Sequence, residues 1–128
     1  MLDHIGISVS DFDRSVAFYK AALAPLSLGL IMSVTREETG AGAGAGFGAE
    51  GKPFFWVGDF RPTQTGVHVA FSARSRAEVE AFYAAAMAAG ARDNGAPGLR
   101  PHYHANYYGA FVLDPDGNNI EAVCHRPE

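Results

Sequence analysis

Three residues with metal-binding side chains stand at related places in the sequence. His4 and His68 each lie on a predicted strand, among small residues and opposite that strand's row of apolar side chains. Glu121 lies on the last predicted strand, residues 117–123, after the turn Asp114-Pro115-Asp116-Gly117. Because a buried charge is costly unless it is paired or bound to a metal, we expect this inward-facing carboxylate to have a partner. Two imidazoles and one carboxylate form a common set of ligands for a divalent metal, with positions left for water or substrate.

An internal repeat places the two histidines at equivalent positions. A Phe-Tyr pair follows each histidine after 14 and 15 residues: Phe18-Tyr19 after His4, and Phe82-Tyr83 after His68. The repeat predicts two copies of a strand–helix–strand–strand–strand unit, and such repeats determine the interpretation of a whole fold. We therefore predict an α+β domain of two modules that pair into a cupped mixed sheet. Their pseudo-twofold symmetry would bring the histidines together in a shared cleft.

The first module, residues 1–60, contains one segment that does not fit a simple pattern. Alternation over 3–10 predicts a strand, and the N-cap Asp11 begins an amphipathic helix that ends at Pro25. Further strands are predicted over 28–34 and 53–58. The Gly- and Ala-rich stretch 40–48 is interpreted either as a flexible hairpin or as a thin strand over which a substrate lies close to the backbone.

The second module, residues 66–126, repeats this order. Residues 66–71 predict a strand, and the capping box from Ser75 to Glu78 begins a helix that ends at Gly90. Residues 92–101 are predicted to be a turn-rich connection, followed by strands over 107–113 and 117–123.

The residue that corresponds to Glu121 in the first module is predicted to be apolar. Counting from the histidines gives Val57, and aligning the turn glycines gives Phe55. Asp59 shares that strand face but lies at the strand end, where it is an alternative fourth ligand. We expect three protein ligands, with water in the remaining positions.

A dense polar and aromatic stretch, residues 102–108, precedes the strand that enters the predicted cleft. Its histidines, His102 and His104, are candidate proton carriers, and Tyr108 is a candidate donor to an oxyanion. The alternative is a surface loop whose aromatic rings pack on the sheet. Candidate substrate-binding residues are Arg100, Tyr103, Tyr107, Phe47 and Trp56. The alternatives are a solvated loop position for Arg100 and core packing for Trp56.

Composition limits the classes of function. A chain of 128 residues is one domain by length, and a net charge of −4 without a basic stripe argues against nucleic acid as a partner. The single cysteine, Cys124, excludes an internal disulfide framework and fits a reducing compartment. Neither a signal peptide nor an apolar run long enough for a membrane is evident, so we expect a cytoplasmic protein without a membrane partner.

These motifs resemble the vicinal oxygen chelate superfamily, which includes glyoxalase I, extradiol dioxygenases, fosfomycin-resistance enzymes and bleomycin-resistance proteins. The resemblance covers nearly the whole chain and rests on three segments: Asp3-His4-Ile5-Gly6, Val67-His68-Val69-Ala70-Phe71, and Asp114-Pro115-Asp116-Gly117-Asn118 with Glu121. It implies paired βαβββ modules around a divalent metal (Zn, Ni, Mn or Fe) held by His4, His68 and Glu121, and a homodimer.

The resemblance also implies a function. The first expectation is a glyoxalase-like lyase or isomerase that acts on a small oxygenated substrate. In glyoxalase I a fourth acidic or amide ligand usually stands where this sequence has Phe55 or Val57. One alternative is an extradiol-type dioxygenase with ferrous iron. Another is a small-molecule binding protein of the bleomycin-resistance kind, without catalysis.

Overall fold

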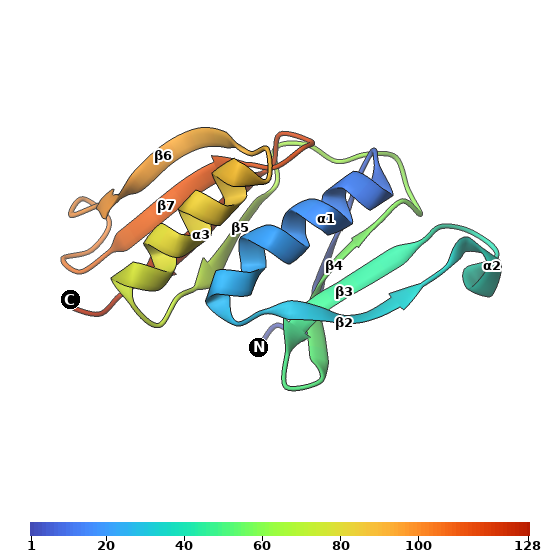
Figure 1. Ribbon diagram of the computed structural model, residues 1–128, viewed down its shortest axis with the longest axis horizontal. Helices are drawn as coiled ribbons and strands as arrows, with labels where there is room; N and C mark the ends of the chain where they lie inside the picture. Colours follow the sequence, from blue (N-terminus) through green and yellow to red (C-terminus); the bar gives the residue numbers. More distant parts are fainter.

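Two four-stranded sheets, each with one long helix on one face, make up the computed structural model, which describes residues 1–128 (Figure 1). The first module contains β1 (Ile5–Ser8), α1 (Phe12–Leu23), the 3-10 turn η1 (Ala24–Leu26), β2 (Gly29–Val34), α2 (Arg36–Thr39), β3 (Gly44–Ala49) and β4 (Lys52–Gly58). The second contains β5 (His68–Ser72), α3 (Arg76–Ala88), β6 (Arg92–Leu99), β7 (Tyr108–Leu113) and β8 (Asn119–Cys124). The predicted α+β class and the two βαβββ modules are confirmed.

The two sheets have the same topology. Their strand orders are β1-β4-β3-β2 and β5-β8-β7-β6, and the first strand of each module pairs in parallel with the last. The remaining neighbours are antiparallel. In consequence β1 and β5 are both edge strands, and each pairs with another strand on one side only.

Local sequence explains where the two long helices begin. The Asp11 side chain accepts a hydrogen bond from the backbone N–H of Arg14 at 3.2 Å, and the Ser75 hydroxyl accepts one from Glu78 at 3.1 Å. Both are N-caps that satisfy an otherwise unpaired helix donor. The Glu78 carboxylate accepts from the N–H of Arg74, one residue before the cap, so the predicted capping box is present only on its Ser75 side.

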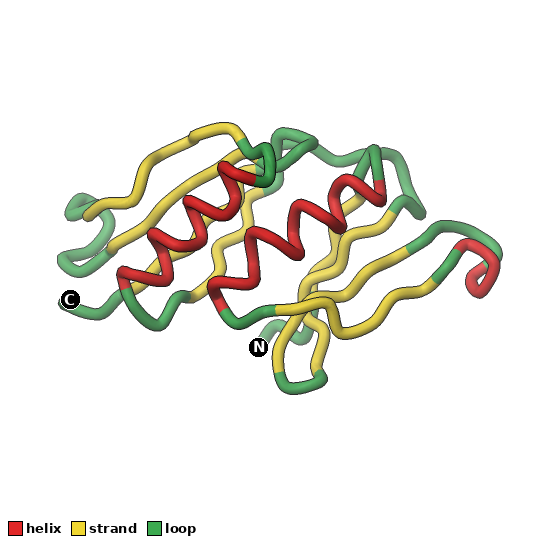
Figure 2. The backbone as a smooth tube through the Cα atoms, viewed as in Figure 1, coloured by secondary structure: helices red, strands yellow, loops and turns green.

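The modules pack together through their helices. α1 and α3 lie side by side on the same side of the two sheets (Figure 2). A single core of 21 buried residues runs under both helices and includes Tyr19 and Phe82 of the repeated Phe-Tyr pairs. The two sheets remain separate within one chain, so the predicted shared cleft between cupped sheets is not formed there.

A buried turn also joins the modules. Asp114 accepts hydrogen bonds from the Tyr19 hydroxyl at 2.5 Å, from Asn118 N at 2.9 Å and from Asp116 N at 2.9 Å. Burial, together with the Asp114 charge, raises the pKa of Tyr19 well above its ordinary value, so the phenol keeps its proton. Gly117 has a φ of 85°, which suits the end of this turn. The Asp-Pro-Asp-Gly segment therefore fixes the start of β8, the strand that carries Glu121.

Two segments differ from their sequence prediction. Residues 92–99, predicted to be a turn-rich connection, form the edge strand β6, whose pairing with β7 contains two register shifts. This run of Gly, Pro and polar residues has no alternating apolar pattern that would predict a strand. Backbone hydrogen bonds to β7 form the strand instead. The Gly- and Ala-rich stretch forms the strand β3 over 44–49, and a substrate that lies along it stays a prediction. No helix is long and apolar enough to cross a membrane.

Candidate functional site

The second module brings three of the candidate residues together on the face of its sheet that lies away from α3, here called the open face. Glu121 pairs in register with Ala70, two residues after His68, so both side chains project from this face. His68 Nε2 lies 3.2 Å from Glu121 Oε1, and the Tyr107 hydroxyl donates a hydrogen bond to Glu121 Oε2. Glu121 is only 1% exposed, whereas the His68 side chain is 49% exposed. The carboxylate is thus buried at the base of the group.

The hydrogen bonds of His68 fix the role of its second nitrogen. Nδ1 lies 3.0 Å from the carbonyl oxygen of Asn119. A carbonyl only accepts, so Nδ1 carries the hydrogen, and in the neutral form of the ring Nε2 is an acceptor that faces Glu121 Oε1. Two acceptors at this separation need a cation between them, either a proton or a metal ion. A ring held by its other nitrogen is also the usual arrangement of a metal-binding histidine.

His4 has the same arrangement in the first module. Its Nδ1 lies 2.7 Å from Asp3 Oδ1, and Lys52 Nζ lies 2.8 Å from Asp3 Oδ2. The hydrogen bond from Lys52, followed by that from His4, lowers the pKa of Asp3, which therefore accepts from the imidazole as a carboxylate. His4 Nε2 is left free on a side chain that is 60% exposed.

The predicted metal triad is not assembled within one chain. His68 and Glu121 meet, but no group of three or more His, Cys, Asp and Glu side chains that could hold a metal is present in the chain. The physical reason is that the modules join through α1 and α3, so pseudo-twofold symmetry does not bring His4 to His68.

The strand register corrects which residue corresponds to Glu121. Gly6, two residues after His4, pairs with Trp56, just as Ala70 pairs with Glu121. The predicted equivalents, Phe55 and Val57, are instead fully buried on the helix side of the sheet. Trp56 therefore occupies the position of the second carboxylate. Asp59 pairs with Arg36 and accepts from Ala43 N at 2.8 Å, so these bonds already use its carboxylate.

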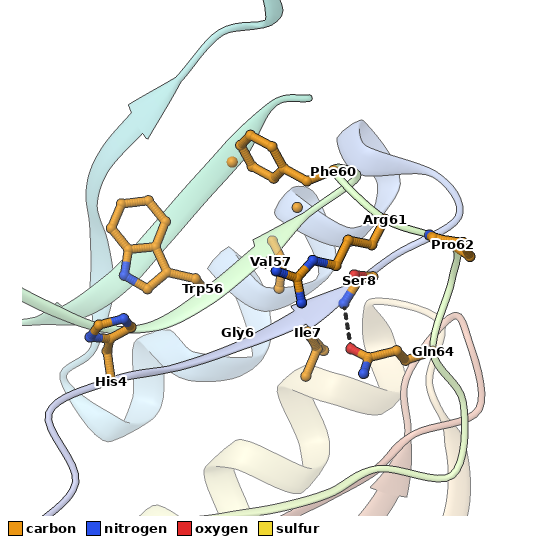
Figure 3. Close-up of a pocket in the computed structure, with 12 residues that line it drawn as sticks. His4, Gly6, Ile7, Ser8, Trp56, Val57, Phe60, Arg61, Pro62 and Gln64 are labelled. Carbon is orange, nitrogen blue, oxygen red and sulfur yellow. Dashed lines mark hydrogen bonds between the residues drawn. The ribbon is translucent and has the colours of Figure 1, made fainter. Parts of the chain in front are cut away.

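A cleft of about 740 Å³ lies on the open face of the first module (Figure 3). It is lined by His4, Gly6, Ile7, Ser8, Gly44, Trp56, Val57, Gly58, Phe60, Arg61, Pro62 and Gln64. Trp56, predicted to bind substrate, lies in this lining. Phe47, predicted for the same role, does not: it is fully buried with its ring 6.2 Å from that of Tyr19, because odd-numbered residues of β3 face α1.

Tyr107 and Tyr108 point to opposite faces of the second sheet. The Tyr108 hydroxyl donates to Glu80 Oε2 on α3 at 2.5 Å, and the Arg76 guanidinium lies 5.0 Å from the centre of its ring. The predicted catalytic role of Tyr108 is therefore corrected, because this residue lies on the helix side. Burial, together with the hydrogen bond to Glu121, raises the pKa of Tyr107, which remains a phenol that donates to the carboxylate.

Aromatic and imidazole rings continue from Tyr107 towards solvent. The ring centres of Tyr103 and His125 lie 5.0 and 5.2 Å from that of Tyr107, and His104 lies 5.4 Å from His125. His102 contacts Tyr103 at 4.3 Å. The exposed His102 and His104 thus lie on a rim outside the His68–Glu121 pair rather than against it.

Arg100 is already bonded to its own module. Its guanidinium donates to the carbonyls of Gly98 and Ala96 at 2.9 and 2.8 Å and lies 5.3 Å from the Phe111 ring centre. These contacts stabilise the bulged strand β6. Sequence reasoning missed Phe60, Arg61, Gln64 and His125, which lie in irregular segments without a periodic signal.

Comparison with known proteins agrees with this fold. Residues 1–122 match the family model described as "Glyoxalase/Bleomycin resistance protein/Dioxygenase superfamily". The chain belongs to this superfamily. The resemblance seen in the sequence is therefore confirmed, and no curated protein matches the chain.

Solved structures of the superfamily show the same fold. A glyoxalase/bleomycin resistance protein from Albidiferax ferrireducens is 27% identical with a TM-score of 0.75, and the match covers 98% of this chain and 99% of that chain. Glyoxalase I from Zea mays is 20% identical with a TM-score of 0.69, and the match covers 99% of this chain but 45% of that chain. The trypanothione-dependent glyoxalase I of Leishmania major is 18% identical with a TM-score of 0.65, covering 98% and 86% of the two chains.

Proposed function

We propose that the protein is a divalent-metal-dependent enzyme that acts as a glyoxalase-like lyase or isomerase on a small oxygenated substrate. The observation that carries this proposal is the 3.2 Å approach of His68 Nε2 to Oε1 of the buried Glu121 carboxylate. A divalent metal satisfies both groups at once. Membership of the superfamily supports the same chemistry.

One chain supplies two ligands, so the third is proposed to come from a second copy. In a symmetric homodimer, His4 of each copy would complete the site formed by His68 and Glu121 of the other. Three observations support this arrangement. His4 Nε2 is free, β1 and β5 are the edge strands of their sheets, and this chain spans about half the length of the maize glyoxalase I chain.

Each residue of the proposed site has a defined task. A bound metal would act as a Lewis acid on adjacent substrate oxygens. Tyr107 holds Glu121 Oε2, which keeps Oε1 turned towards His68. The raised pKa of Tyr107 keeps it in the donor form, so it orients the carboxylate and does not act as a base. With Trp56 in place of a second carboxylate, proton transfer falls to groups outside the ligand set, of which His104 on the rim is the proposed candidate.

Metal content of mixed variants tests the composite site. We expect wild-type protein loaded anaerobically with zinc, nickel, manganese or iron to retain one metal per chain by mass spectrometry. His4→Ala and His68→Ala should each lose it. Refolding the two variants together should restore one intact site in each mixed dimer, or about one quarter of a metal per chain in a random mixture.

Each result of that test has a clear meaning. Absence of restored metal would show that the site is not shared between copies. Absence of metal in the wild type after reconstitution would contradict the metal-dependent function itself. Self-mixed His68→Ala serves as the control, because it contains no intact site.

One observation favours a second candidate function. Two histidines and one carboxylate are the ligand types of non-haem ferrous oxygenases, so an extradiol-type dioxygenase is the alternative. Iron-loaded protein that consumes oxygen in the presence of a catechol would support the dioxygenase. Turnover by the zinc, nickel or manganese form without oxygen uptake would support the lyase or isomerase.

A further inference from the structure

Arg61 carries the only formal charge among the residues that line the first-module cleft. None of the twelve residues is Asp or Glu. The protein as a whole carries a net charge of −4, so the positive charge of the cleft lining is opposite in sign to the net charge of the chain. A cleft of one charge sign attracts ligands of the opposite sign.

Arg61 is the charged group in this cleft that is free to bind a ligand. Its guanidinium makes no hydrogen bond or ion pair within the chain, whereas those of Arg36, Arg74 and Arg100 are all bonded. Figure 3 shows the guanidinium turned back over the floor formed by β1 and β4, between Phe60 and Gln64. A planar guanidinium with free donors is the side chain best suited to a carboxylate, which it binds through two parallel hydrogen bonds.

The segment that carries Arg61 is fixed to the sheet. Gln64 N donates to Ser8 O at 3.0 Å, and Ser8 N donates to Gln64 Oε1, also at 3.0 Å. Thr65 donates through its hydroxyl to Asp116 O at 2.9 Å. These bonds extend the edge of β1 and hold the connection beside the cleft, so Arg61 stands on an anchored loop.

Two aromatic rings lie over the glycines of the same face. A Cβ added at Gly46 would lie 2.8 Å from ring atoms of Trp56, and one added at Gly58 would lie 3.0 Å from the Phe60 ring. The absence of Cβ atoms therefore lets both rings lie close to the backbone. They provide an apolar wall next to the cationic group, which is the usual composition of a small-molecule site.

We propose that this cleft binds the carboxylate group of a small organic acid, with Arg61 holding the carboxylate and Trp56 and Phe60 contacting its apolar body. The inference rests on the proposed function in that it names the substrate class of the same site. The carboxylate end lies at Arg61, and the oxygenated end of the substrate extends towards His4.

Trp56 provides the signal that tests this inference, because it is the only tryptophan in the chain. Chelator-treated protein is titrated with sodium phenylacetate and with its neutral isostere phenylacetamide, and tryptophan emission is recorded. We expect a saturable change with phenylacetate and at least about tenfold weaker binding of phenylacetamide. Arg61→Ala should weaken phenylacetate binding by about tenfold or more, and Arg61→Lys should fall between the two.

Arg14→Ala is the matched control, because it removes the same charge from an exposed position on α1, outside the cleft. Its phenylacetate affinity should equal that of the wild type. The inference is overturned if phenylacetate gives no saturable change, if phenylacetamide binds equally well, or if Arg61→Ala binds phenylacetate like the wild type.

The metal content of the same proteins separates this inference from the proposed function. Arg61 is not a proposed metal ligand, so Arg61→Ala should load as much metal as the wild type. Selective phenylacetate binding by a wild type that loads no metal would support the carboxylate site and overturn the metal-dependent function. Normal metal loading without selective phenylacetate binding would support the metal-dependent function and overturn the carboxylate site.

Discussion

Deletion of one oxygen atom, that of the Tyr107 hydroxyl, removes the hydrogen bond between Tyr107 and Glu121. Tyr107→Phe deletes the hydroxyl that donates to Glu121 Oε2. It keeps the ring, whose centre lies 5.0 Å from that of Tyr103 and 5.2 Å from that of His125. Because Glu121 is 1% exposed, water cannot replace the lost donor unless the sheet face opens. The carboxylate is then left with His68 as its remaining side-chain partner.

The size of the effect follows from the burial of the acceptor. A hydrogen bond to a charged group contributes about 1.5–3 kcal/mol, and we expect Tyr107→Phe to lower the free energy of unfolding by about 2 kcal/mol. For a domain of 128 residues, whose entropy of unfolding scales with chain length, this loss corresponds to a fall of about 7 °C in Tm.

Urea unfolding of the metal-free protein at pH 7 measures this loss. Tyr103→Phe is the matched control, because the Tyr103 hydroxyl makes no hydrogen bond in the chain and the residue is 61% exposed. It should change stability by less than about 0.5 kcal/mol. In a Glu121→Gln background, where no charge remains, the cost of Tyr107→Phe should shrink by about 1 kcal/mol. Equal losses for the Tyr103 and Tyr107 variants would show that the Tyr107 hydroxyl does not stabilise Glu121.

Three further predictions follow from the structure. Folding raises the pKa of Tyr107, so the unfolded chain loses that proton at a lower pH than the folded protein. The free energy of unfolding should therefore fall as the pH rises above the ordinary tyrosine value of 10.0. Urea unfolding at several pH values should show a less steep fall for Tyr107→Phe. Asp114→Ala removes the acceptor of the Tyr19 hydroxyl and of the backbone N–H groups of Asp116 and Asn118, and it should cost about 3–5 kcal/mol in urea unfolding. A loss under about 1 kcal/mol would contradict the bridging role of the turn. Gly46→Ala places a Cβ 2.8 Å from the Trp56 ring, so it should shift Trp56 emission to longer wavelength and cost about 1–3 kcal/mol; unchanged emission would show that the ring does not lie over this glycine.

Several structural features could be predicted from the sequence because they depend only on residues that are close together in the chain. The N-caps at Asp11 and Ser75 are local hydrogen bonds, and the alternation around His4 and His68 follows from the period of a strand. A histidine followed at the same spacing by a Phe-Tyr pair occurs twice, and this repeat alone predicts two modules without knowledge of any tertiary contact. Burial of Glu121 was inferred from the same alternation and agrees with its 1% exposure.

Other features were beyond the sequence because they depend on strand pairing. β6 lacks an apolar pattern and is held by backbone pairing to β7, so its sequence predicts a connection instead of a strand. Sequence counting placed the counterpart of Glu121 at Val57 or Phe55, one residue to either side of Trp56. A shift of one residue exchanges the two faces of a strand, and only the register of β1 with β4 resolves it.

Which side chains are available for chemistry, and which face of its strand each one occupies, follows from the sequence alone. His4, His68 and Glu121 were found in this way because strand alternation is a local property of the backbone. Which of these side chains meet depends on how the two modules pack. The modules pack through α1 and α3, so Glu121 meets His68 and Tyr107 in one place while His4 lies with Trp56 and Arg61 in another. How modules pack depends on which surfaces fit together across the whole fold, and no local pattern records that choice.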